Sequence, residues 1–172
     1  LKYNSRKHLS PRGEIFLQWY ADKVYVFDEK MRHTATLDSP GGMRGLLPEG
    51  ERAVVDNLCS PSTRTEGLRL RVASLTDLGS THHELAVPAE GAYAEDDDVR
   101  ACGLQDGKVA VVVVTKPFCD LYDELGRHTG RTALPGDAGL PTCTPSYILV
   151  PLWQQPRICV LDWGGQITQI LE

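Results

Sequence analysis

Basic and aromatic residues recur along this chain in short segments that the surrounding pattern predicts to be turns or strand starts. Seven are basic and three are aromatic: Lys7, Lys23, Arg44, Arg64, Arg100, Lys116 and Arg157, with Tyr20, Phe118 and Trp153. Lysine and arginine bind phosphate and carboxylate groups, and aromatic rings stack on unpaired bases. Gathered on one surface, these residues would bind RNA or an acidic or phosphorylated peptide.

The composition also supports a plainer interpretation, in which these cations are scattered and solvated. Charged residues make up 24% of the 172 residues, so cations in polar loops need no special role. The net charge of −5 is unlike that of a general nucleic-acid-binding protein. The acidic run Glu95–Asp98 would lie on the same surface and would repel phosphate or screen the cations until a partner arrives. Both interpretations stay open at this point.

Residues suited to catalysis or metal binding are sparse. His82 and His83 are neighbours in an expected strand, so their side chains face opposite ways and cannot easily bind one metal. His33 and His128 occur in the similar phrases MRHTAT and GRHTGR, which repeat inheritance explains. His8, near an inner strand, is the histidine best placed to be a ligand. With no G-x-S-x-G or H-E-x-x-H motif, the sequence predicts no catalytic residue, no metal site and no cofactor.

The cysteines favour a reducing compartment. There are five, none in C-x-x-C spacing: Cys59, Cys102, Cys119, Cys143 and Cys159. We expect free structural thiols, with a disulfide or a metal or redox role as alternatives. No apolar stretch reaches transmembrane length and no secretory signal is visible, so we expect a cytoplasmic protein. Because the chain begins inside a repeat, we also expect it to be part of a longer protein.

The elements that must position these residues form a repeat. An apolar run, a polar turn and a second short run occur at 24–37, 72–85, 119–134 and 158–171. The turns open at Asp28, Thr76, Asp123 and Asp162, at intervals of 48, 47 and 39 residues. Self-similarity at this period predicts a repeat architecture, and such scaffolds usually bind other molecules.

Each repeat is predicted to contain four short strands, because β-branched and aromatic residues alternate with Gly-containing and Asp-containing turns. The run VAVVVV at 109–114 predicts a central strand buried on both faces, and no apolar stripe with helical spacing is present. Four-stranded units of this length predict an all-β β-propeller. The expected domain is 1–172, with blades at approximately 4–37, 43–85, 98–134 and 141–171. Leu58–Gly67 and Pro88–Asp98 are expected to be inserted surface loops.

The pattern of glycine, strand, turn, V-x-V-F-D-x-x-G and strand resembles the NHL repeat. The stretch DGKVAVVVVTKPFCDLYDELGR carries it best, followed by SYILVPLWQQPRICVLDWGGQ. The resemblance implies a propeller similar to the C-terminal NHL or NHL-like domain of tripartite-motif (TRIM) ubiquitin ligases. It also implies a recognition module that binds protein substrates or RNA hairpins through one face, with the catalytic RING elsewhere. Since NHL propellers usually have six blades, the four visible ones imply two further blades upstream or a smaller or incomplete ring.

We therefore expect a binding module of a ubiquitin ligase with no enzymatic activity of its own. In a propeller, the loops between second and third strands share one face with the connections between blades, and the basic and aromatic residues are predicted to lie there. Protein is the expected partner, RNA is the second candidate, self-association through unpaired apolar faces is a third, and no membrane partner is expected. The alternative functions are a metal-dependent hydrolase or lyase using the central channel and a purely structural assembly propeller.

Overall fold

The computed structural model describes residues 6–10, 12–20, 23–57 and 67–172. All regular structure in these ranges is β-strand, as the absence of a helical apolar stripe predicts. No helix among the described residues is long and apolar enough to cross a membrane. The predicted loop Leu58–Gly67 lies outside the described residues except for Gly67, and so does Cys59.

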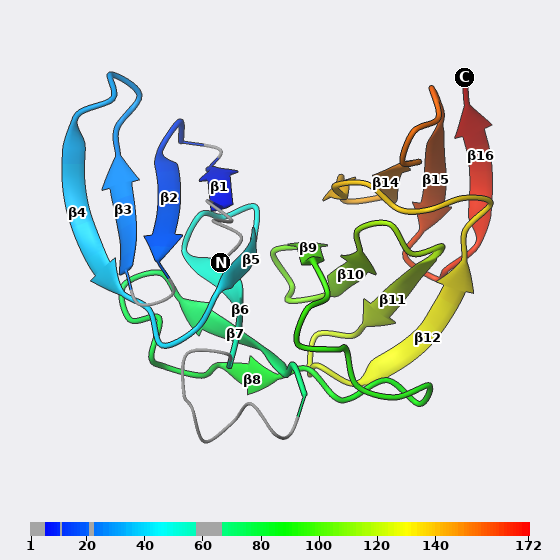
Figure 1. The fold of residues 1–172 in the computed structure, drawn as a ribbon, viewed down its shortest axis with the longest axis horizontal. Coiled ribbons are helices and arrows are strands. Elements are labelled where there is room, and N and C mark those ends of the chain that lie inside the picture. Colours follow the sequence, from blue (N-terminus) through cyan, green and yellow to red (C-terminus); the bar gives the residue numbers. More distant parts are fainter. Residues whose placement is uncertain (1–5, 11, 21–22, 58–66) are drawn as a thin grey trace. The chain divides into compact units, whose positions relative to one another are not determined.

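Four sheets follow one another along the chain, each with four antiparallel strands in sequential order (Figure 1). The first contains β1 (Arg6–Leu9), β2 (Ile15–Tyr20), β3 (Lys23–Phe27) and β4 (His33–Asp38). The second contains β5 (Met43–Leu46), β6 (Arg52–Asp56), β7 (Leu70–Ser74) and β8 (His83–Glu84). The third contains β9 (Val99–Gly103), β10 (Val109–Val113), β11 (Phe118–Tyr122) and β12 (His128–Ala133). The fourth contains β13 (Thr142–Cys143), β14 (Tyr147–Pro151), β15 (Ile158–Asp162) and β16 (Ile167–Leu171).

This meander is the strand order of propeller blades, so the predicted all-β class with four-stranded antiparallel blades is confirmed. The chain forms two compact units, a first unit of Leu1–Glu84 and a second unit of Leu85–Glu172. Each unit contains two sheets. The expectation of a single propeller domain over 1–172 stays a prediction.

Apolar side chains between the two sheets form the core of each unit. In the first unit, Val24 and Val26 of β3 share a buried cluster with Val55 of β6. In the second unit, Cys119 and Leu121 of β11 share one with residues of the fourth sheet. Removing such surface from water contributes about 25 cal/mol per Å² of apolar area. Packing of sheet on sheet is therefore the main source of stability in each unit.

The central strand β10 is buried along its whole length, from Val109 to Val113. Its apolar side chains point alternately to both faces of the third sheet. The prediction of a central strand buried on both faces is confirmed.

A shared turn structure explains the repeated phrase. Asp28 and Asp123 directly follow the third strand of their sheets, and Asp162 is the last residue of β15. The Oδ1 atom of each accepts the backbone N–H groups two and four residues later at 2.8–3.0 Å. The N–H of Arg32, and then its guanidinium, lower the pKa of Asp28. Six residues after each aspartate, a threonine hydroxyl donates to a carbonyl of the third strand. The sequence phrase thus encodes a hydrogen-bonded aspartate turn.

The second sheet departs from this turn. Thr76, aligned with the three aspartates in sequence, donates its N–H to the hydroxyl of Ser74 at 3.2 Å. Asp77, one residue later, is the residue that accepts a backbone N–H, from Gly79 at 3.0 Å. The polar turn is present where it was predicted, but the acid that accepts its backbone N–H has shifted by one residue, from the position of Thr76 to Asp77.

In the first sheet, one residue of the aspartate turn has a strained backbone conformation. Met31 has φ of 61°, whereas Gly126 and Gly165 hold the same position at 76° and 86°. Side chains disfavour this left-handed region and glycine does not. We predict that Met31→Gly raises the free energy of unfolding by up to about 1 kcal/mol in chemical denaturation. Lys30→Gly, one residue earlier, should lower it; if both substitutions lower it, strain at Met31 is not significant.

Candidate functional site

A buried carboxylate lies in the middle of β11. Asp120 has no solvent exposure, whereas the aligned positions of the other three phrases hold Tyr25, Ala73 and Cys159. A buried carboxylate is costly unless it is paired and hydrogen-bonded. Its neighbours must therefore supply both charge and hydrogen bonds.

Four hydrogen bonds saturate the two oxygens of Asp120. Oδ1 accepts from Arg131 Nε at 2.8 Å and from His128 Nε2 at 3.0 Å. Oδ2 accepts from Arg131 Nη2 and from the Tyr93 hydroxyl, both at 2.8 Å. A carboxylate offers about four lone-pair sites, so none is left for another ligand. The bidentate Arg131 fork supplies the compensating charge.

Aromatic rings surround this ion pair. The Arg131 guanidinium lies over the Phe118 ring, 3.9 Å from its centroid, and the His128 ring packs 5.3 Å from that of Tyr122. The Tyr93 and Tyr122 hydroxyls are 3.0 Å apart. Burial, with the negative charge nearby, raises the pKa of both tyrosines, so both hydroxyls stay protonated and can donate. Hydrogen bonds to Asp120 raise the pKa of Arg131.

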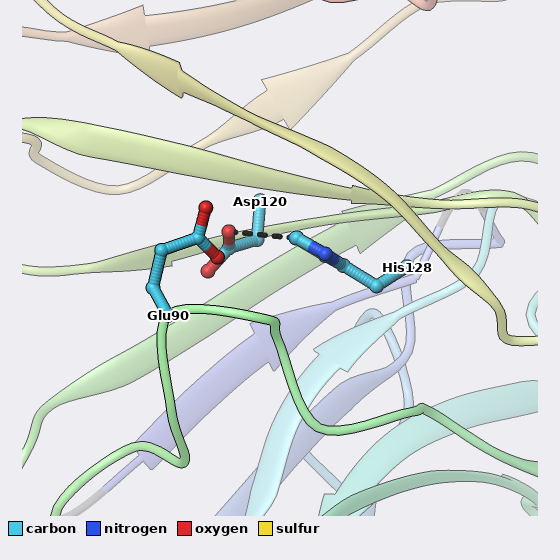
Figure 2. A group of neighbouring side chains, drawn as sticks. All are labelled: Glu90, Asp120 and His128. Atoms are coloured by element: carbon cyan, nitrogen blue, oxygen red, sulfur yellow. Dashed lines mark hydrogen bonds and ion pairs between the residues drawn. The ribbon is translucent and has the colours of Figure 1, made fainter.

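Glu90, Asp120 and His128 bring three potential ligand atoms within 4.8 Å of one another (Figure 2). The charge they would offer a metal ion already faces a cation, because Arg131 forks onto Asp120 and lies 3.9 Å from a Glu90 oxygen. A divalent ion would have to displace a guanidinium that cannot be deprotonated. The cluster is accordingly a salt-bridged anchor and does not fit a metal centre.

This anchor fastens the inserted segment Pro88–Asp98 to the third sheet. Tyr93, in the middle of the segment, is 5% exposed and reaches Asp120. Two further ion pairs hold its end: Asp97 with Lys116 at 2.6 Å and Asp98 with Arg100 at 2.9 Å. Most of the segment is exposed, as a surface loop should be. It is nevertheless attached to the sheet at several points.

Most of the predicted basic residues that the structure describes form ion pairs with carboxylates. Arg44 is the clearest correction: it is 2% exposed and paired with Asp56, itself 1% exposed, with Nε and Oδ2 2.5 Å apart. Asp56 also accepts the N–H of Gly42 at 2.7 Å, so the pair fixes the connection into the second sheet. Arg44 therefore cannot belong to an exposed basic face, because burial and pairing remove its charge from the surface.

The other predicted binding residues are distributed between the two units. Lys23 is paired with Asp38, and Arg157 with Glu172 at 2.8 Å. Lys7 is exposed on β1. Arg64 lies outside the described residues, and of Tyr20 only the place in β2 is described. Of the predicted aromatics, Phe118 lies under Arg131 and Trp153 is 46% exposed.

In the second unit, the loops between second and third strands lie on the same face as the connection between the two sheets, as expected. The connection 134–141 is hydrogen-bonded to both turns beside it: Thr115 N–H donates to Ala138 O at 2.9 Å, and Trp153 N–H to Asp137 O at 2.6 Å. Two more backbone bonds, Ala138 N–H to Lys116 O and Gly139 N–H to Pro151 O, complete it. We call the surface formed by 115–118, 134–141 and 152–157 the turn face of the second unit.

Among the histidines, His8 donates through Nε2 to the Met43 carbonyl oxygen at 3.2 Å. His33 packs against Phe27 as His128 packs against Tyr122, in the matching position after each aspartate turn. Sequence reasoning missed the anchor of Glu90, Tyr93, Asp120, His128 and Arg131. The available signal was an acidic residue within the apolar run CDLY.

No protein-family model matches this chain, and no curated protein sequence matches it. Solved structures do. A protein of unknown function from Bacteroides caccae matches with a TM-score of 0.64 and 14% identity, over 100% of this chain and 62% of that one. A chain of a nidogen/laminin complex matches with a TM-score of 0.61 and 10% identity, over 92% of this chain and 59% of that one. Dihydro-heme d1 dehydrogenase NirN, in complex with DHE, matches with a TM-score of 0.56 and 16% identity, over 99% of this chain and 37% of that one.

These likenesses support the β-propeller type of fold, and at such identities they show the fold alone. This chain spans 37–62% of the length of those three chains. The resemblance to NHL repeats and to tripartite-motif ligases stays a prediction.

We predict that Asp120→Asn lowers the free energy of unfolding by roughly 3 kcal/mol, because it leaves Arg131 without its partner charge. The same substitution should speed amide hydrogen exchange in 88–98. Asp123→Asn is the matched control: it lies in the exposed turn and keeps an oxygen for the backbone N–H groups, so it should cost less than about 1 kcal/mol. Equal losses in the two variants would show that Asp120 is not an anchor.

We also predict that neither excess Zn²⁺ nor a chelator changes the melting temperature. Binding to the folded state would raise it by mass action. A rise with Zn²⁺ that Glu90→Gln and His128→Gln both abolish would show that the cluster binds metal despite Arg131.

Proposed function

We propose that this chain is a recognition module that binds a protein partner through the turn face of the second unit. The observation that carries the proposal is Trp153, whose side chain is 46% exposed while its backbone N–H donates to the Asp137 carbonyl. Tryptophan is enriched among the residues that dominate protein interfaces, and a rigid anchor loses little conformational entropy on binding.

The charges around Trp153 favour protein over RNA. Lys116 and Arg157, on the same face, are paired with Asp97 and Glu172. Nucleic-acid sites gain affinity when unpaired cations replace the counterions of phosphate groups. Cations that already face carboxylates would bring negative charge toward the phosphates, whereas a protein surface can supply charges of both signs.

The role that we propose for this module comes from its resemblance to the C-terminal domains of tripartite-motif ubiquitin ligases. We infer that the module selects substrates for a ubiquitin ligase whose catalytic part lies outside this chain, and that it acts in the cytoplasm. All four described cysteines are free, which suits a reducing compartment. The nidogen/laminin structure gives an example of this fold in a protein complex.

We propose no catalytic step for this chain. The nearest approach to acid-base machinery is the Asp120–His128 pair, and both oxygens of Asp120 are saturated by Arg131, His128 and Tyr93. A general base must reach a substrate proton with a free lone pair. Asp120 has none, so it suits anchoring.

The test is site-specific photocrosslinking in cells, with a photoreactive phenylalanine analogue at position 153. The same analogue at Leu125, which is 63% exposed in the turn at the other end of β11, is the control. Proteins crosslinked only from position 153 are then purified for affinity measurements. We predict that Trp153→Ala weakens their binding at least about tenfold, while Leu125→Ala has little effect.

Two results would contradict the proposal. Equal losses from both variants would mean that the turn face is not the interface. Crosslinks from position 153 mainly to RNA, with affinity falling steeply as salt rises, would assign the face to nucleic acid. If partners bind as predicted but their ubiquitylation does not change when the full-length protein is removed, the ligase part fails and the recognition part stands.

A further inference from the structure

Two thiols meet where the inner strands of the third and fourth sheets run side by side. Cys102 is in β9 and Cys143 in β13, and these two strands are in contact although they belong to different sheets. Cys143 Sγ lies 3.0 Å from the carbonyl oxygen of Gly103, the residue after Cys102. Each thiol also shifts the pKa of the other, as expected for side chains that are neighbours in space. They are 41 positions apart in sequence, at 102 and 143, and adjacent in space.

The two cysteines differ in their access to solvent and in acidity. Cys143 is partly exposed, whereas Cys102 is 7% exposed and belongs to the core cluster of the second unit. The Cys102 thiol lowers the pKa of Cys143, and the same contact, with burial, raises the pKa of Cys102. The thiolate is the reactive form of cysteine. Cys143 therefore has the features of an attacking thiol, and Cys102 those of the thiol that resolves it.

The other described cysteines lack this combination. Cys119 and Cys159 are fully buried, and burial raises the pKa of each. They behave as small apolar residues of the core. This contrast supplies internal controls within one chain.

We propose that Cys102 and Cys143 form a reversible disulfide that joins the third and fourth sheets. The oxidant is a small-molecule disulfide of the glutathione class. The Cys143 thiolate attacks one sulfur of that disulfide, forms a mixed disulfide and releases the first small thiol. The Cys102 sulfur, losing its proton, then attacks Cys143 Sγ and releases the second small thiol. Two protein thiols are oxidised and one small disulfide is reduced to two thiols.

The chain is well suited to a direct test by mass spectrometry. The protein is equilibrated in glutathione buffers of increasing oxidation, alkylated, and digested with trypsin. Cys102 and Cys143 fall in separate tryptic peptides, 101–108 and 132–157, each with a single cysteine. We expect these two peptides to become linked, and the link to disappear after reduction. We also expect the linked protein to melt at a higher temperature, because the bond restricts the unfolded chain.

Two variants separate the roles of the two thiols. Cys102→Ser should leave Cys143 as a stable mixed disulfide with glutathione and should slow its alkylation at neutral pH several-fold, because the neighbouring thiol is lost. Cys143→Ser should leave Cys102 unmodified in the folded protein. Cys119→Val, which places the residue found at Val24 in the aligned position, should leave the 102–143 link intact. Circular dichroism of each full-length variant checks that the protein stays folded.

Three outcomes would overturn the proposal. One is persistence of free thiols at 102 and 143 in the most oxidising buffer while the protein stays folded. Another is linkage of either cysteine mainly to Cys59, Cys119 or Cys159. The third is faster alkylation of Cys119 or Cys159 than of Cys143 in the folded protein.

Discussion

The second unit depends on the compensation of one buried charge. Asp120 lies in a strand that otherwise packs apolar side chains, and the third sheet can hold it only with a partner for each oxygen. Arg131 comes from the neighbouring strand, but Tyr93 must come from the inserted segment. The need to satisfy Asp120 therefore places 88–98 against the third sheet.

That placement determines the charge of the surface nearby. Once the segment is anchored at Tyr93, its acidic end lies beside two of the cations predicted to bind phosphate. Asp97 pairs with Lys116 and Asp98 with Arg100. The sequence predicts a basic surface here, but in the fold the same surface carries both positive and negative charges. This is the physical reason for preferring a protein partner with charges of both signs to RNA.

Local features of the fold were predictable from the sequence, because they depend on residues close together in the chain. The aspartate turns at Asp28, Asp123 and Asp162 need only an acid and the N–H groups two and four residues later. The burial of β10 follows from its continuous apolar run. The exception is informative: in the second sheet, alignment by repeat placed Thr76 where the structure uses its neighbour, Asp77. Repeat alignment cannot detect a one-residue shift of the acid.

Pairings between distant residues were not predictable in this way. Arg44 and Arg100 occupy similar positions in their repeats, yet one is buried against Asp56 and the other is partly exposed beside Asp98. The difference depends on which carboxylate a neighbouring strand or loop presents, and the repeat pattern carries no such information. The same holds for Cys102 and Cys143, which are far apart in the sequence and lie on the contacting strands β9 and β13 in the fold.

The most direct measurement of the central claim is hydrogen exchange of the second unit with and without a bound protein partner. The account predicts protection at 115–118, 134–141 and 152–157 and no change at 123–127; protection confined to 123–127 and 163–166 would contradict it.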